Sequence, residues 1–163
     1  MSQTRATLVG DRLPSALLAE LIDGQVVSAR AYDVLGQGRT LAIGVPGAFT
    51  PTCSDQHVPG LVNNADRLRR SGFDHLVCIV ASDPFVTHAW SKVVDRGRKV
   101  RFVSDGNLYF ARALGLTSHE QKLFLGERSE RYLMVARSGI IETVRVEAHI
   151  ASYTCTQPDD LVL

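Results

Sequence analysis

Cysteine is scarce in this chain: there are three among 163 residues, too few for a disulfide scaffold. None of the three has the close-spaced partner that a zinc site needs, and the five histidines form no metal-ligand pattern, so we expect no metal and no other cofactor. The Cys-x-x-Cys motif of thiol–disulfide oxidoreductases is also missing, because Gln56 stands three positions after Cys53. Redox catalysis and packing remain as roles for these cysteines.

Long apolar runs and an excess of one charge are absent as well. No apolar stretch approaches the length of a membrane span, and the first residues lack the apolar region of a secretory signal, so we expect a cytoplasmic protein without a membrane partner. The formal net charge is +1, with Lys and Arg spread along the sequence, which argues against nucleic acid as a partner. With 45% hydrophobic and 21% charged residues, we expect residues 1–163 to form one soluble domain.

The apolar segments are short and alternate with helical segments. Glycine or proline marks several boundaries: Pro84 opens a helix, Gly115 stops another, and residues 137–139 join the last two strands as a hairpin. This alternation predicts an α/β fold with a central mixed sheet flanked by helices. The expected strands are residues 25–28, 40–45, 75–81, 100–103, 132–136 and 140–146, and the expected helices run from about 51 to 70, 84 to 97 and 108 to 114.

The most informative residues follow the expected strand at residues 40–45. Thr50 suits the N-cap of a helix and Pro51 its first position, which places Cys53 about third in the helix. Amide N–H groups at that point have no partner inside the helix, and with the helix dipole they favour an anion. The pattern indicates a thiolate nucleophile. The alternative is that Cys53 is a small apolar residue that covers the start of the helix.

Pro46, Thr50 and Cys53 match the active-site motif of the peroxiredoxins, which are thiol peroxidases with a thioredoxin-like fold. The surrounding residues resemble the five-type, atypical two-cysteine branch of that family. The resemblance implies a thioredoxin-like fold and an antioxidant enzyme that reduces hydrogen peroxide and organic hydroperoxides. It covers nearly the whole chain, through residues 47–54, 57–60, 83–86, 89–90, 113–116, 128–129, 131–132 and 146–147.

The resemblance also implies a role for each residue around the sulfur. Cys53 attacks the peroxide, Thr50 orients it with a hydroxyl, and Pro46 shields the sulfur from water. Arg131 matches the family arginine whose guanidinium contacts thiolate and peroxide together. Arg128 is the competing choice, and in the simplest alternative both arginines are solvated loop residues.

Cys155 lies eight positions after Glu147, where resemblance implies a resolving cysteine that forms a disulfide with oxidised Cys53. The alternative is an idle thiol near a loosely held C-terminus. The disulfide requires local unfolding, because the helix buries the first sulfur. The resemblance further implies recycling by thioredoxin or by glutaredoxin with glutathione, and a homodimer. A rival hypothesis is a redox sensor or holdase in which oxidation of Cys53 changes assembly.

Four other features have weaker interpretations. His57 follows Cys53 by about one helical turn and either helps to hold the site or is structural. Cys78 lies in a continuous apolar strand, and we expect an inert core thiol. Trp90 is expected to pack in the core. Residues 123–125 are apolar and either line the substrate pocket or belong to the core.

Overall fold

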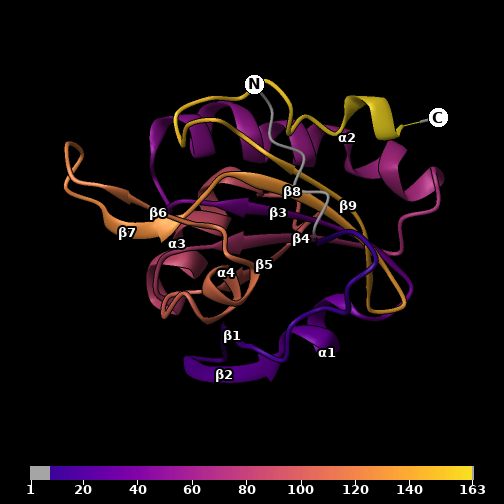
Figure 1. Ribbon diagram of the computed structural model, residues 1–163, viewed down its shortest axis with the longest axis horizontal. Coiled ribbons are helices and arrows are strands. Elements are labelled where there is room, and N and C mark those ends of the chain that lie inside the picture. Colours follow the sequence, from indigo (N-terminus) through magenta and orange to yellow (C-terminus); the bar gives the residue numbers. More distant parts are fainter. Residues whose placement is uncertain (1–7, 163) are drawn as a thin grey trace.

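The computed structural model describes residues 8–162, in which a seven-stranded sheet lies between helices on its two faces (Figure 1). The strands of this sheet are β1 (Leu17–Ile22), β2 (Gln25–Arg30), β3 (Arg39–Val45), β4 (His75–Val80), β5 (Arg101–Ser104), β8 (Tyr132–Arg137) and β9 (Ile140–Val146). Their order is β2-β1-β5-β4-β3-β8-β9. β5, β4 and β3 are parallel, whereas the outer pairs are antiparallel. The predicted α/β fold with a central mixed sheet is confirmed.

The alternation of side chains along the strands divides the core in two. On one face, Leu41 and Ile43 of β3 pack with α2 (Val58–Arg70) and with Trp90 of α3 (Pro84–Val94). On the other face, Ala42 and its neighbours pack with α1 (Ala31–Leu35) and α4 (Tyr109–Leu114). Each fully buried Leu or Ile contributes about 1.5–3 kcal/mol to folding. The first of these cores is the one that holds α2, and with it Cys53, against the sheet.

Capping and turn residues set the element boundaries close to where the sequence predicts them. The Asp83 carboxylate accepts from the Val86 amide at 2.9 Å, and Pro84 occupies the first turn of α3. Gly115 ends α4 in the left-handed conformation, at φ +66°. Ser138 and Gly139, at φ +49° and +82°, form the predicted hairpin between β8 and β9.

Several elements are not among the predicted ones: β1, α1, a two-stranded arm made of β6 (Thr117–Glu120) and β7 (Gly126–Ser129), and a short 3-10 helix, η3 (Asp159–Leu161). Figure 1 shows the arm extending from the body of the molecule. At its turn, Leu123 is 60% and Phe124 96% exposed, so the core interpretation of these two residues is wrong. No helix within residues 8–162 is long and apolar enough to cross a membrane.

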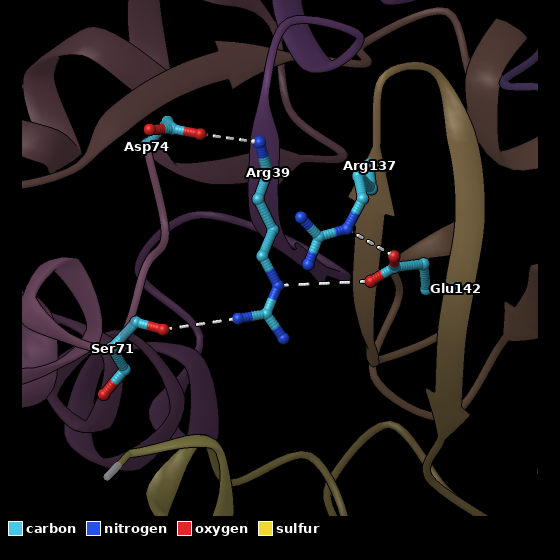
Figure 2. A network of polar contacts seen from close by, with 5 residues as sticks. All are labelled: Arg39, Ser71, Asp74, Arg137 and Glu142. Atoms are coloured by element: carbon cyan, nitrogen blue, oxygen red, sulfur yellow. Dashed lines mark hydrogen bonds and ion pairs between the residues drawn. The ribbon is translucent and has the colours of Figure 1, made fainter.

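At one end of β3, Arg39 joins three segments (Figure 2). Its amide donates to the Asp74 carboxylate at 2.8 Å, and its guanidinium donates to the Ser71 carbonyl at 3.4 Å, at the end of α2. The same guanidinium lies 4.0 Å from the Glu142 carboxylate of β9, which also accepts from Arg137 at 2.7 Å. The network ties β3 to α2, to β4 and to the β8–β9 hairpin.

Candidate active site

Pro46 and Gly47 are buried and end β3 at its other end, where the chain turns into a short loop. The loop is held from two sides, because the Ala48 amide donates to the Ser82 hydroxyl at 3.1 Å and the Thr50 hydroxyl donates to the Gly47 carbonyl at 2.9 Å. The Thr50 carbonyl accepts from the Ser54 amide at 2.9 Å, so Thr50 occupies the predicted N-cap position, directly before the helix. Because its hydroxyl donates to the Gly47 carbonyl, the lone pairs of the hydroxyl oxygen remain available to accept from another donor.

The helix begins at Pro51 and places Cys53 third, as predicted, but residues Cys53–His57 form a π turn before α2. The Val58 amide donates to the Cys53 carbonyl, five residues back. Cys53 and His57 are both fully buried on the side that faces the sheet. A π turn inside a helix is often found at a functional site, and here it brings the thiol and the imidazole to the same cation.

That cation is Arg131, which directly precedes β8 and is 1% exposed. Its Nη2 donates to the Cys53 Sγ at 3.2 Å, and its Nη1 donates to the His57 Nδ1 at 3.0 Å. Nε and Nη2 both donate to the Ile150 carbonyl, at 2.9 and 2.7 Å. Within the described residues 8–162 none of these partners is a carboxylate, so the positive charge of the guanidinium can act on the Cys53 sulfur. A cation that donates to sulfur stabilises the thiolate.

His57 is an uncharged acceptor for this arginine. Its burial, and then the charge of Arg131, lower the pKa of His57 to about 3. Its Nδ1 therefore accepts from the guanidinium, and its ring packs against the Tyr153 ring at 5.3 Å between centroids. The sequence left the role of His57 open, and the structure assigns it a contact with Arg131. Two signals pointed to it in the sequence, namely its spacing of four residues from Cys53 and its place in the matched segment 57–60.

Arg128, the competing arginine, has different partners. It donates to the carbonyls of Leu125, Ala81 and Pro46, at 2.9, 2.7 and 3.5 Å. These contacts support the backbone beside the active-site loop and leave the sulfur to Arg131. Leu125 and Arg128 line an open cleft of about 540 Å³ that also includes Thr50. Of the apolar run at residues 123–125, Leu125 is therefore the member that lines a cleft near the site.

Cys155 lies in the segment that follows β9, and it is a free thiol like Cys53 and Cys78. Its Sγ donates to the Val146 carbonyl at 3.4 Å, and its amide donates to the Glu147 carboxylate at 2.9 Å. Burial and the charge of Glu147 raise the pKa of Cys155. The segment around Cys155 is thus hydrogen-bonded, and the role of this thiol, resolving or idle, stays a prediction.

The two remaining predictions for core residues are confirmed by burial. Cys78 is fully buried in β4, and burial raises the pKa of its thiol well above the ordinary value. Trp90 is fully buried, with its ring edge-on to Phe102 at 5.9 Å. Its indole N–H donates to the Ser54 hydroxyl at 3.0 Å, one residue after Cys53.

Known proteins resemble this chain over nearly its whole length. A sequence profile of the redoxin family matches residues 8–159. Peroxiredoxin-2E of Arabidopsis thaliana, a chloroplastic protein, is 36% identical over 98% of this chain and 69% of its own length. Peroxiredoxin-2B of the same plant is 33% identical over 94% of this chain and 95% of its own. The chain belongs to the peroxiredoxin family.

Solved peroxiredoxin structures have the same fold. Reduced Prx3 of Vibrio vulnificus in complex with hydrogen peroxide aligns with a TM-score of 0.85 and 32% identity, over 94% of this chain and 96% of that one. Peroxiredoxin 5 of Alvinella pompejana aligns with a TM-score of 0.78 and 33% identity, over 87% and 90%. The thioredoxin-like fold is confirmed. As a peroxiredoxin, the protein is a thiol-dependent peroxidase that takes a peroxide as substrate and a thiol as reductant.

Proposed function

We propose that this peroxiredoxin reduces hydrogen peroxide and organic hydroperoxides by attack of the Cys53 thiolate on one peroxide oxygen. An S–O bond forms, the O–O bond breaks, and the departing oxygen takes a proton to leave as water or an alcohol. Cys53 becomes a sulfenic acid, oxidised by two electrons. The observation that carries this proposal is the hydrogen bond from the Arg131 guanidinium to the Cys53 sulfur, without a competing carboxylate among the described residues.

The other site residues act on the substrate. The Thr50 hydroxyl donates a hydrogen bond to the Gly47 carbonyl, so its oxygen lone pairs can accept from the O–H of the peroxide and orient the substrate. The Cys53 amide and Arg131 then stabilise the charge that develops on the departing oxygen. Pro46 is buried beside the loop and keeps water from the sulfur.

Cys155 is the proposed resolving cysteine. Its sulfur attacks the Cys53 sulfenic sulfur, the S–O bond breaks, and hydroxide leaves as water with the Cys155 proton. The product is a Cys53–Cys155 disulfide. Because Cys53 is fully buried and each sulfur has its own partner in this structure, the helix and the Cys155 segment must open locally before the bond forms. A dithiol such as thioredoxin, or glutaredoxin with glutathione, then reduces the disulfide.

A homodimer and a cytoplasmic location complete the proposal. Large apolar side chains are exposed around the active-site loop and on the arm, and such a surface fits a second copy of the chain. Phe85 and Tyr109 line one open cleft, and Val86 and Leu125 line the next. The exposed residues that support the dimer are Phe49, Phe85, Val86, Tyr109, Leu123 and Phe124. The cytoplasmic location stays a prediction.

Mass spectrometry of the intact protein and its peptides after one equivalent of hydrogen peroxide, with and without a sulfenic-acid trap, tests the cycle. We expect a Cys53–Cys155 linkage. A trapped sulfenic acid that persists on Cys53 indicates a one-cysteine cycle instead. If Cys53 is not oxidised rapidly, or if Cys53→Ser retains turnover, the proposed mechanism is wrong.

A further inference from the structure

Glu147, directly after β9, has the densest set of hydrogen bonds around the Cys155 segment. Its Oε1 accepts from the amides of Thr154, Cys155 and Thr156, at 2.7, 2.9 and 3.0 Å. The Thr154 and Thr156 hydroxyls donate to Oε2 and Oε1, at 2.8 and 2.9 Å. Three consecutive amides thus converge on one carboxylate that is 5% exposed. The set fixes the backbone on both sides of Cys155.

The hydrogen bonds also outweigh the cost of burying the charge. Burial by itself raises the pKa of Glu147, but the amides and hydroxyls of residues 154–156 lower it to about 2. The side chain is therefore an anion at neutral pH. The charge of Glu147 and its hydrogen bonds are therefore both present while residues 154–156 have the conformation seen in this structure.

The same segment covers the peroxidatic site. The Ile150 carbonyl accepts twice from Arg131, and the Ala151 carbonyl accepts from the Thr52 hydroxyl at 3.1 Å. The Tyr153 ring packs on His57. Residues 150–156 therefore hold the guanidinium and also carry the second thiol, so one anchor affects both halves of the cycle.

We propose that Glu147 is a positioning residue, a latch that keeps residues 150–156 closed over Arg131 while Cys53 attacks peroxide, and that its release limits the rate at which Cys155 reaches oxidised Cys53. The proposal rests on the proposed resolving role of Cys155. A tight latch favours the first step, because Arg131 stays in place. It slows the second step, because Cys155 is held against the Val146 carbonyl.

The second step competes with further oxidation. In one reaction, the Cys53 sulfenic acid condenses with the Cys155 thiol, which forms the disulfide and releases water. In the other, a second peroxide oxidises the Cys53 sulfur by two more electrons to sulfinic acid and is itself reduced to water or an alcohol. The latch thus sets the ratio of disulfide to sulfinic acid at a given peroxide concentration. A merely structural role of Glu147 predicts no particular direction of change in this ratio, so the ratio distinguishes the two roles.

Glu147→Gln tests the latch, because it keeps the shape and the Oε1 acceptor but removes the charge. Against a fixed excess of hydrogen peroxide, we expect the ratio of disulfide to sulfinic acid to rise by about tenfold, since hydrogen bonds to a charged acceptor are weakened together. We expect the rate of Cys53 oxidation to fall. Trp90, the sole tryptophan, reports that rate by stopped-flow fluorescence, and intact-mass spectrometry gives the ratio.

Asp160→Asn is the matched control, because it weakens the Arg145–Asp160 ion pair in the same C-terminal stretch without touching residues 150–156. It should leave both readouts at the wild-type value. In a Cys155→Ser background, the Cys53–Cys155 disulfide cannot form. There, Glu147→Gln should lower the formation of sulfinic acid only as far as the slower oxidation of Cys53 by peroxide explains. If Glu147→Gln does not fold, Thr156→Val removes one donor to the same carboxylate and should shift the ratio in the same direction.

The outcomes separate the two proposals. A wild-type protein that forms no Cys53–Cys155 disulfide overturns the resolving role, and the latch with it. A wild-type protein that forms the disulfide, with an unchanged or lower ratio in Glu147→Gln, overturns the latch alone. An equal rise of the ratio in Asp160→Asn also overturns it, because any loosening of the C-terminal stretch then has the same effect.

Discussion

Two arginines lie at opposite ends of β3, and each joins three segments of the chain, yet their partners differ in charge. Arg39 is paired with the Glu142 carboxylate, and its guanidinium also lies over the Phe73 ring, 4.1 Å from the centroid. Arg131 contacts a carbonyl, a neutral imidazole and a thiol. A cation that is neutralised holds the fold together, whereas a cation with uncharged partners can act on a reacting sulfur.

Burial makes the difference larger. The Arg39 side chain is 26% exposed, so water screens its ion pair, and such pairs contribute about 0–1 kcal/mol. Arg131 is 1% exposed, in surroundings where each electrostatic interaction is stronger. Among residues 8–162, the buried Arg131 side chain hydrogen-bonds to no carboxylate, whereas the partly exposed Arg39 side chain has a carboxylate partner. We take this as the physical signature that distinguishes the active end from the structural end.

Replacing Arg131 should have the largest effect. Arg131→Lys keeps the charge but loses the planar fork that reaches Cys53, His57 and Ile150 at once. We expect the rate constant for Cys53 oxidation to fall about a hundredfold, as when one oxyanion-stabilising donor is lost. Stopped-flow fluorescence of Trp90 measures it. Arg39→Lys is the matched control and should stay within about twofold. An unchanged rate in Arg131→Lys would move the role to Arg128.

Removing the neutral acceptor should have a smaller effect. His57→Leu deprives the Arg131 Nη1 of its partner and lets the guanidinium turn from the sulfur. We expect the oxidation rate to fall about tenfold, the equivalent of one hydrogen bond of about 1.4 kcal/mol. His57→Gln supplies a side-chain oxygen acceptor and should recover part of the rate. Equal rates for the two variants would mean that the imidazole has no part in holding Arg131.

The sequence predicted the elements whose boundaries depend on local chemistry. Pro84 and Gly115 mark helix ends, and residues 137–139 form a hairpin, because backbone restriction at proline and freedom at glycine act within a few residues. Thr50 is a further example, because its carbonyl accepts from the Ser54 amide at the predicted start of the helix. The hydrogen bond that its hydroxyl donates to the Gly47 carbonyl was not predicted, since the residue type alone does not select that acceptor.

Local pattern predicted Cys53 at the start of a helix, whereas the residues that surround its sulfur were predicted from the resemblance. Arg131 and Cys53 are 78 positions apart, and no local pattern brings them together. The π turn was missed because helical periodicity does not distinguish it from an α-helix. Glu147 belonged to a matched motif without a role, since its five donors come from a segment that has no regular secondary structure.

The buried histidine adds a pH dependence to the free energy of unfolding. The folded pKa of His57, about 3, lies below the value of about 6.5 expected when unfolded. Between these values the unfolded chain binds a proton that the folded chain does not, so stability falls as pH falls through this window. We expect the wild type to lose about 1 kcal/mol per pH unit more than His57→Gln, between pH 6 and pH 4.

Urea denaturation at pH 6, 5 and 4 measures this difference. Glu142→Gln, at the Arg39 end, leaves His57 in place and should keep the full dependence on pH that His57 contributes. Parallel curves for the wild type and His57→Gln would show that His57 takes up a proton in the folded state. That result would contradict its assignment as a neutral acceptor for Arg131.

The smallest effect should come from the surface network. Glu142→Gln removes the charge that faces Arg39 and Arg137, and we expect the free energy of unfolding to fall by about 0.5 kcal/mol, because both pairs are partly exposed. The loss should shrink at high salt, since mobile ions screen exposed charges. Peroxidase turnover should not change, because β3 still presents Pro46 from the same buried strand. A loss of turnover without a loss of stability would mean that the two ends of the sheet are coupled, and that the charge of the Arg39 partner matters to the distant sulfur.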